Sequence, residues 1–241
     1  MPGIFARWAT LGSLPWARGG SPQHGSDCRE QEASAWAGSR AVIVGLREQD
    51  TAPDPMSQFR RWFAEAEAAG VLDRDAMVVA TADRDGDPSA RVVLLRGVDE
   101  RGFRFFTNFE SAKGRDLAGR PRAALVFHWR EQGRQVRVTG DVTRLDEGES
   151  LEYWRHRPRA SRLSAWASRQ SEPIADRASL EAAAATVADR LGDEVPLPPF
   201  WGGYLVAPDA VEFWQHRDDR LHDRLRYQDS GEGWVLQRLQ P

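Results

Sequence analysis

The spacing of apolar residues along this chain changes several times, and each change predicts a different kind of element. Between Phe59 and Ala66, large apolar side chains recur at the spacing of one helix face. An Asp-Pro pair at residues 54–55 precedes them, and this pair suits the start of a helix because aspartate caps and proline fits the first turn. The pattern therefore predicts one amphipathic helix from Asp54 to about Ala69.

Short apolar runs separated by turn residues follow this helix and predict β-strands. The expected strands cover residues 77–82, 90–96, 103–107, 123–129 and 135–140. One small helix is expected near residues 111–117. Closely spaced strands with so little helix between them favour an antiparallel sheet that closes as a barrel, and they disfavour a parallel Rossmann winding.

The second half of the chain begins with helical composition and returns to strands. Ala, Leu, Glu and Arg predict helices over residues 147–155, 159–168 and 175–191. Pro196-Leu-Pro-Pro ends this region, and strands are expected at residues 201–206, 211–214 and 233–239. The sequence thus predicts a mainly β fold with peripheral helices, of the α+β class.

Residues 1–52 differ from the rest because they are rich in Gly, Ser, Ala and isolated Trp without a sustained period. We interpret them as a disordered extension, and residues 53–241 as one folded domain. Arg7 and Arg18 precede the first acidic residue, which leaves a targeting peptide open. The apolar stretches here are too short and broken for a secretory signal.

Charge and cysteine content narrow the functional classes. The formal net charge of -3 argues against a nucleic-acid binder that works through bulk electrostatics, although it permits a local basic pocket. The single cysteine, Cys28, excludes an intrachain disulfide and fits a reducing cytoplasm. Apolar runs stay far shorter than the roughly 18 residues that a membrane helix needs, so we expect no membrane partner.

Among the 33 basic side chains that are Lys or Arg, only Lys113 is a lysine. It stands in Ser-Ala-Lys-Gly, which is not the Gly-Lys-Ser/Thr of a phosphate-binding Walker loop. Schiff-base chemistry would have to use this one residue. If the protein binds phosphates, arginine must therefore supply most of the contacts, through its planar fork of donors.

Two segments could together bind an anion. Arg91 and Arg96 enclose Val-Val-Leu-Leu, which reads either as a core strand with charged ends or as part of a binding site. Phe106-Thr-Asn and Ser111-Ala-Lys113 add hydroxyls and a cation just past the next strand, so a phosphate could lie between the two segments.

Further candidates are open to two interpretations each. Gln135 begins a strand, where its amide could face solvent or bond the edge of a heterocycle. Tyr153, Arg157 and Ser161 would share one helix face if the helix continued through Pro158; otherwise they belong to a solvated helix end.

The segment from Phe213 to Arg224 is unusual because it places three arginines, three aspartates and two histidines behind a Phe-Trp pair. Together with segments elsewhere, it resembles the pyridoxamine 5'-phosphate oxidase family over residues 54–241. The motifs that carry the resemblance, in chain order, are Arg91-Val-Val-Leu-Leu, Phe106-Thr-Asn, Gln135-Val, Arg157-Pro-Arg, Ala165-Trp-Ala-Ser-Arg-Gln-Ser171, Pro198-Pro-Phe-Trp-Gly-Gly203, Phe213-Trp-Gln and Arg220-Leu-His-Asp-Arg224.

The resemblance implies an FMN-binding split barrel that works as a homodimer with sites at the subunit interface. The implied reaction oxidises pyridoxamine or pyridoxine 5'-phosphate to pyridoxal 5'-phosphate with O2, and it releases H2O2, and ammonia from the amine. The residues implied for FMN are Arg91, Val92, Val93, Leu94, Leu95, Arg96, Phe106, Thr107, Ala112, Lys113, Gln135, Gln170, Ser171, Trp214 and Arg224. Those implied for the substrate are Arg96, Tyr153, Arg157, Ser161, Arg220, Leu221 and His222, with Arg220 and His222 closest to the chemistry.

The sequence departs from the family pattern in three respects. Arg96 replaces a lysine of many relatives, and Ala112 replaces a residue that is commonly basic. The family's N-terminal Arg and Tyr that close over the substrate have no recognisable counterpart near residues 41–46. Two alternatives stay open: a split-barrel flavoprotein with another substrate, and a non-catalytic carrier of pyridoxal phosphate.

Overall fold

The computed structural model describes residues 45–241. Its first long helix, α2 (Pro55–Ala68), confirms the predicted amphipathic helix almost to the residue. Asp54 caps this helix by accepting a hydrogen bond from the Ser57 N–H at 2.8 Å, and Pro55 occupies the first turn. Local sequence alone accounts for this helix start.

The strands form one nine-stranded sheet in which each pairing is antiparallel. The order along the sheet is β2-β1-β5-β6-β7-β4-β3, and β8 and β9 continue from β7. The prediction of an antiparallel α+β fold is therefore confirmed. The strands are β1 (Ala76–Ala82), β2 (Pro88–Leu94), β3 (Gly97–Asp99), β4 (Gly102–Asn108), β5 (Arg122–Trp129), β6 (Arg134–Arg144), β7 (Trp201–Gln215), β8 (Asp223–Asp229) and β9 (Trp234–Arg238).

The strand β7 organises the sheet because it pairs with three neighbours. One edge lies along β6, whereas the other pairs first with β4 and then with β8. We expected two strands here, but β7 is continuous, and a register shift between Thr139 and Gly140 of β6 accommodates the bend near Pro208. The prediction also missed the short β3 and the whole of β8.

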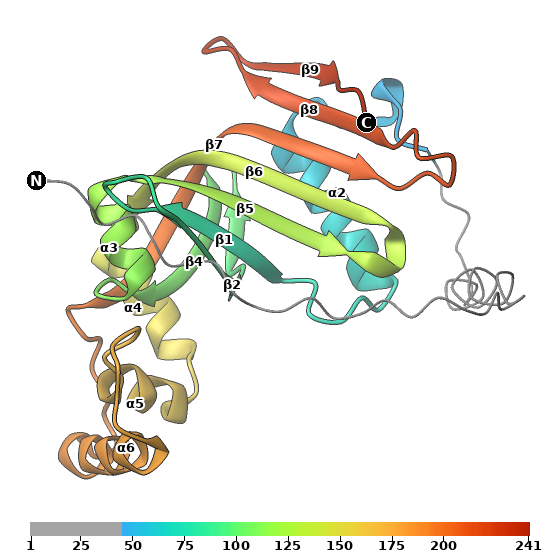
Figure 1. Ribbon diagram of the computed structural model, residues 1–241. Helices are drawn as coiled ribbons and strands as arrows, with labels where there is room; N and C mark the ends of the chain where they lie inside the picture. The colour runs from blue at the N-terminus through green and yellow to red at the C-terminus, as the bar shows by residue number, and fades with distance from the viewer. Residues whose placement is uncertain (1–44) are drawn as a thin grey trace, which may run out of the picture. The chain divides into compact units, whose positions relative to one another are not determined.

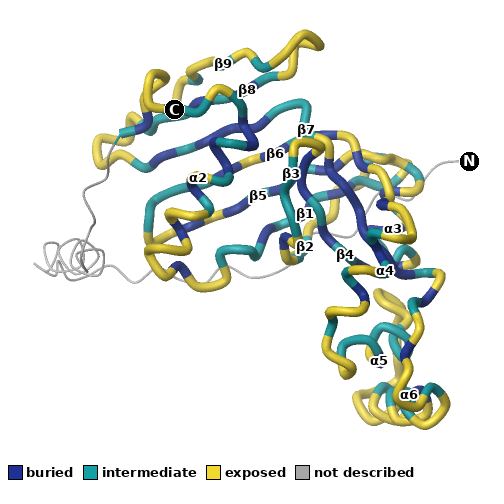
Figure 2. The backbone as a smooth tube through the Cα atoms, turned by 180° about the vertical axis from the view of Figure 1, so that it is seen from behind, coloured by how far each residue is buried: buried dark blue, intermediate teal, exposed yellow. Residues whose placement is uncertain are grey.

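The main core lies between α2 and one face of the sheet (Figure 1). Phe59 is fully buried, and its ring centroid lies 4.9 Å from those of Phe103 and Phe127. Trp62 meets Phe213 of β7 edge-on at 5.2 Å. Figure 2 shows the buried backbone following β5, β6 and β7 beneath this helix. Burial of these aromatic side chains fixes the sheet that carries the site.

A second, smaller core holds the helices that lie between β6 and β7 in the sequence. It is built from Trp154, Leu163, Val187, Val195 and Trp201. The helices are α4 (Glu147–His156), α5 (Arg159–Ala167) and α6 (Arg177–Leu191), and α3 (Ala112–Gly119) lies earlier in the chain. In both views α6 lies farthest from the sheet and is mostly exposed (Figure 2).

The expected N-terminal extension falls mainly on residues 1–44, which lie outside the described residues. The remainder of it, residues 45–52, contacts the C-terminal strands. Leu46 is buried in the main core, and the Tyr227 hydroxyl donates to the Ala52 carbonyl at 2.6 Å. Within residues 45–241, no helix has the length and apolar character needed to cross a membrane.

Candidate functional site

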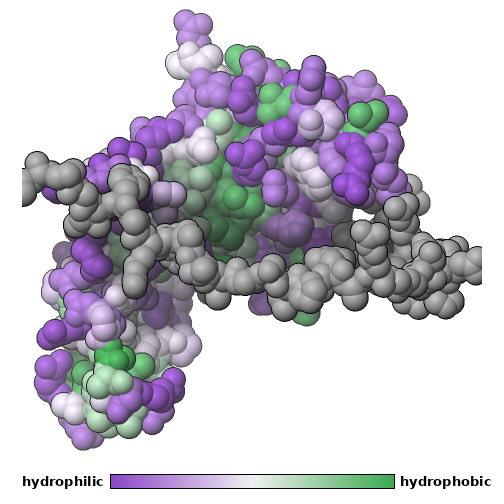
Figure 3. All heavy atoms as spheres, in the orientation of Figure 1, coloured by the Kyte–Doolittle hydropathy of each residue, from purple (hydrophilic) through white to green (hydrophobic). Residues whose placement is uncertain are grey.

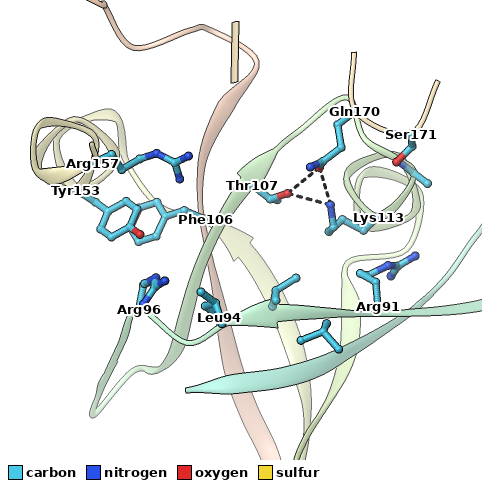
Figure 4. Close-up of a pocket in the computed structure, with 13 residues that line it drawn as sticks. Arg91, Leu94, Arg96, Phe106, Thr107, Lys113, Tyr153, Arg157, Gln170 and Ser171 are labelled. Carbon is cyan, nitrogen blue, oxygen red and sulfur yellow. Dashed lines mark hydrogen bonds between the residues drawn. The ribbon is translucent and has the colours of Figure 1, made fainter. Parts of the chain in front are cut away.

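A cavity of about 470 Å³ lies where β2, β4, α3, α4 and the loop after α5 meet. Cavities of this size hold small organic molecules. Figure 4 shows that polar groups collect at two separate places around it, with Leu94 between them. Its lining consists of Arg91, Val92, Val93, Leu94, Arg96, Phe106, Thr107, Ala112, Lys113, Tyr153, Arg157, Gln170 and Ser171.

The first polar group surrounds Arg91 on β2. Its guanidinium donates to the hydroxyls of Thr81 at 2.7 Å and Ser89 at 2.5 Å. Both hydroxyls also donate to one carboxylate oxygen of Asp116, which lies 3.8 Å from Arg91. This network orients the Arg91 guanidinium at the lining of the cavity. Asp116 was not predicted, because the sequence does not show that α3 packs beside β1.

Lys113 belongs to the same end of the cavity and is itself buried. Its ammonium donates to Thr107 Oγ1 at 2.9 Å, Ser111 Oγ at 3.0 Å and Gln170 Oε1 at 2.8 Å. Burial, together with the charge of Arg91, lowers the pKa of Lys113 to about 8. A buried ammonium whose hydrogen bonds go to neutral oxygens has a high free energy in its charged form. Binding of an anion beside it would lower that free energy.

The loop after α5 closes this end. Gln170 accepts from both Lys113 and Thr107, and the Ser171 hydroxyl accepts from the Ala112 N–H at 3.2 Å. Ser171 has a positive φ of 77°, an uncommon value outside glycine. Ser111 caps α3 by accepting from Gly114 N–H, so the first turn of the helix lies at the cavity.

The second polar group combines two arginines with stacked aromatic rings. Phe106 and Tyr153 stack at a centroid distance of 4.0 Å with 14° between their planes. Arg157 lies over the Trp201 ring at 4.6 Å, and Arg96 pairs with Asp75 at 2.8 Å. Burial lowers the pKa of Arg157, although a guanidinium stays protonated in proteins. The cavity therefore has a second cationic end, beside an aromatic surface.

The other residues expected in the site lie outside this lining. Gln135, Trp214 and Arg224 are in register across β6, β7 and β8. Arg224 makes two contacts to the Glu212 carboxylate, at 2.8 and 3.1 Å, so its charge is already matched in a single chain.

The loop before β8 carries three further candidates, Arg220, Leu221 and His222. Leu221 is 66% exposed and Arg220 has a positive φ of 66°. The Arg217 N–H donates to His222 Nδ1 at 3.0 Å, so the proton of the neutral ring sits on Nε2. The His222 ring lies 4.7 Å from Trp214. These residues form a second cluster on the sheet, separate from the cavity within one chain.

Two expected residues are placed differently. The Leu95 side chain is buried in the main core, so only its backbone can face a ligand. Helix α4 ends at His156 and α5 begins after Pro158, so the helix does not continue through the proline. Ser161 consequently lies outside the cavity lining, and its carbonyl accepts a hydrogen bond from Arg157 at 3.1 Å.

Apolar surface surrounds part of the cavity. Figure 3 shows it gathered over the region where β1, β2 and β4 lie, with hydrophilic residues around it. Val92 and Leu94 of β2 contribute, with 65% and 40% of their surface exposed. A ring system or another protein surface would find an apolar contact there.

Comparison with known proteins identifies two matching family models. The pyridoxamine 5'-phosphate oxidase model matches residues 63–190, and the model of the pyridoxine 5'-phosphate oxidase C-terminal dimerisation region matches residues 201–241. A pyridoxine/pyridoxamine 5'-phosphate oxidase of Cupriavidus taiwanensis is 53% identical over 201 residues, covering 83% of this chain and 95% of that protein. The protein of the same name from Rubrobacter xylanophilus is 55% identical over 199 residues, covering 82% and 92%.

Two solved structures are also similar. PhzG of Burkholderia lata, crystallised with tetrahydrophenazine-1-carboxylic acid, is 36% identical with a TM-score of 0.79, and the match covers 84% of this chain and 100% of PhzG. A pyridoxamine 5'-phosphate oxidase-related, FMN-binding protein of Nostoc punctiforme shares the fold at 21% identity, with a TM-score of 0.63 and coverages of 78% and 98%. The split-barrel fold expected from the sequence is thereby confirmed.

Proposed function

Because the chain belongs to the pyridoxamine 5'-phosphate oxidase family, we propose that it uses FMN to oxidise pyridoxine or pyridoxamine 5'-phosphate to pyridoxal 5'-phosphate. O2 is the proposed electron acceptor and H2O2 the second product, with ammonia released when the substrate is the amine. The residues carried over from the family, as given in the sequence analysis, are the proposed site.

The observation that carries this proposal is the presence of two cationic ends in one cavity (Figure 4). The reaction brings two phosphorylated rings together, and each phosphate carries nearly two negative charges. Arg91 and Lys113 supply positive charge at one end, and Arg96 and Arg157 supply it at the other. A site for one unphosphorylated ligand needs no such arrangement.

The donor set at the Arg91 end fits the phosphate of FMN. Arg91 is oriented by hydroxyls, the Lys113 ammonium is buried, and the Ser171 hydroxyl and the first N–H groups of α3 lie beside them. Bound FMN would supply the redox chemistry, by accepting a hydride equivalent from the C4' carbon of the substrate. Val92, Val93 and Leu94 offer an apolar surface for its ring.

The chain's own residues mainly bind and orient the substrate. Arg157 and Arg96 are proposed to hold the substrate phosphate, and the Tyr153 hydroxyl adds a neutral donor. His222 would present its Nε2 proton to the polar edge of the pyridine ring, because Nδ1 already accepts from the Arg217 backbone. Fixing the ring in this way holds the reacting carbon at a constant position.

We propose that a homodimer completes the site, as the match to the C-terminal dimerisation model supports. Trp214, Arg224 and the 220–222 loop lie away from the cavity of their own chain, so we assign them to the cavity of the partner. The exposed apolar side chains of β2 give the partner a surface to cover. One chain would then bind most of the cofactor while the other contributes a wall over the substrate.

The similarity to PhzG supports a second candidate, the oxidation of a tricyclic acid that carries no phosphate. The two guanidinium groups at the substrate end favour a phosphorylated ligand instead. Oxygen uptake by the FMN-loaded protein, measured with pyridoxine 5'-phosphate and with pyridoxine, tests the proposal. We expect uptake with the phosphorylated compound and at least about 100-fold less without the phosphate, which loses about two charge-assisted contacts. A colourless protein that stays inert after FMN is added would contradict the proposal.

A further inference from the structure

Arg238, the last residue of β9, joins the beginning and the end of the described chain. Its guanidinium contacts both carboxylate oxygens of Glu48, at 2.7 and 2.9 Å, and it donates to the Leu46 carbonyl at 2.9 Å. The hydrogen bond from Arg238 lowers the pKa of Glu48 to about 2. The two parallel contacts to Glu48 fix the orientation of the Arg238 guanidinium.

The Nη1 group of Arg238 contacts Asp223, the residue directly after the 216–222 loop. Arg238 Nη1 lies 2.8 Å from Asp223 Oδ1, while Asp223 Oδ2 accepts from the Leu46 N–H at 3.1 Å. Asp223 Oδ2 also lies 3.6 Å from Arg217 Nη1. The Asp223 side chain is only 15% exposed, so these contacts are partly shielded from water.

The N-terminal segment lies against the base of the same loop. Leu46 is 5% exposed and belongs to the main core, which anchors the segment. A Cβ added at Gly45 would lie 2.6 Å from the Arg217 guanidinium, so glycine allows the close approach. Segments that are almost 200 residues apart in sequence are thus joined around one aspartate.

Several hydrogen bonds of the 216–222 loop join residues of the loop to one another. Its described bonds include Arg217 N–H to His222 Nδ1, Leu221 N–H to Asp219 Oδ1 and Arg220 N–H to the Arg217 carbonyl. All of these lie within the loop, so they fix its internal form but not its direction. Contacts with the rest of the chain set its direction: His216 N–H donates to the Gly133 carbonyl, the His222 ring packs on Trp214 at 4.7 Å, and Asp223 meets Arg238 at the base of the loop.

We propose that Glu48, Arg238 and Asp223 form a positioning clamp that holds the 216–222 loop in the direction at which Arg220 and His222 meet the substrate. None of the three clamp residues needs to touch the ligand. The inference rests on the proposed function, since it concerns residues whose role is proposed above. It extends the substrate site to a segment that the sequence analysis assigned to the N-terminal extension.

The test compares Glu48→Gln with a matched control, Glu100→Gln. Both changes remove a carboxylate partner of one arginine, but Glu100 is 86% exposed, pairs with Arg60 and lies in the turn between β3 and β4. The first measurement is trypsin cleavage of the FMN-loaded protein, resolved by site with mass spectrometry. We expect the rate of cleavage after Arg217 and Arg220 to rise about fivefold in Glu48→Gln, because the loop loses one stabilising ion pair. The rate at these two sites should stay unchanged in Glu100→Gln.

The second measurement separates positioning from general stability. In Glu48→Gln, the KM for pyridoxine 5'-phosphate should rise about fivefold while kcat and FMN affinity stay within about twofold. Glu48→Asp retains the carboxylate and should recover most of the difference. Unchanged cleavage at the two loop sites, or an equal rise at every cleavage site, would overturn the clamp. If the wild-type protein oxidises neither substrate, the proposed function fails, and the cleavage pattern still decides whether the clamp holds the loop.

Discussion

Lys113 and Gln170 are 57 positions apart in the sequence, yet the Lys113 ammonium donates a hydrogen bond to the Gln170 side chain at 2.8 Å. This contact joins the first turn of α3 to the loop after α5, and both segments line the cavity. The ammonium is buried, and the oxygens that accept its hydrogen bonds are neutral, so none of the described residues that line the cavity supplies a negative charge to balance it.

FMN should bind more weakly above pH 8 because Lys113 loses its proton. Burial lowers the pKa of the Lys113 ammonium to about 8, whereas a bound phosphate favours the charged form. Protonation is therefore linked to binding, and the Kd should rise up to about tenfold between pH 8 and pH 9. Quenching of flavin fluorescence measures this Kd. Riboflavin has no phosphate and should show little change, and Lys113→Met should remove the pH dependence of FMN; an equal dependence for both flavins would contradict the assignment.

Arg220→Ala should weaken turnover far more than cofactor retention. Arg220 lies in the loop beside His222 and is assigned to the substrate, whereas the proposed phosphate site of FMN lies around Arg91 and Lys113. We expect kcat/KM for pyridoxine 5'-phosphate to fall at least about 100-fold, as when a charged hydrogen bond is removed. FMN affinity should change less than about threefold in the same preparation. Equal losses in a flavin titration and in steady-state rates would refute the separate roles.

Gly114→Ala should destabilise the protein, although alanine is the better helix former. A Cβ at Gly114 would lie 2.0 Å from the Phe109 carbonyl oxygen, so α3 must move away from the segment after β4. The steric cost, about 1–3 kcal/mol, should exceed the gain of about 1 kcal/mol in helix propensity. Urea denaturation measures the net effect.

Gly119→Ala is the matched control for this change. It lies in the same helix, and its added Cβ would meet only the flexible side chain of Arg84 at 2.7 Å. We expect the control to be nearly neutral and to retain FMN, whereas Gly114→Ala should also bind FMN more weakly because Lys113 moves with α3. If Gly114→Ala instead stabilises the protein, the backbone at Phe109 can move away from the added Cβ at little cost in free energy.

The contribution of Glu48 to stability should disappear in acid. Its pKa is lowered to about 2 in the folded protein, against an ordinary value of 4.5, so the folded state favours the carboxylate. The stabilisation is therefore complete above about pH 5 and is lost as the pH falls towards 2. The pair is partly exposed, so the free energy of unfolding should differ by no more than about 1 kcal/mol between wild type and Glu48→Gln at pH 7. That difference should shrink between pH 5 and pH 3; a constant difference would mean that the carboxylate charge is not involved.

Much of the fold could be predicted because local patterns and tertiary packing agree. The Asp54 cap and the apolar face of α2 appear in the sequence with the right spacing, and the structure uses both. Strand β8 was missed because only Leu225 and Tyr227 are buried in it, and charged or polar residues occupy the other positions. This segment forms a strand because it pairs with β7 on one side and β9 on the other, and the local sequence does not indicate these pairings.

The candidate site was only partly predictable for a related reason. The family resemblance supplied all of the cavity-lining residues, but it gave no sign that Asp116, Thr81 and Ser89 orient Arg91. Those contacts depend on α3 lying beside β1 and β2. Similarly, Pro158 made the common face of Tyr153 and Ser161 uncertain, and the structure separates them by ending one helix and starting another.

The exposed apolar side chains of β2 also affect how the protein behaves before assembly. This strand is at one end of the sheet order, and it presents Val92 and Leu94 beside unpaired backbone groups. Such an edge templates intermolecular β-pairing unless something covers it. A newly folded chain that has not met its partner is therefore the species most prone to aggregate, and variants that weaken the subunit contact should scatter light before they lose secondary structure.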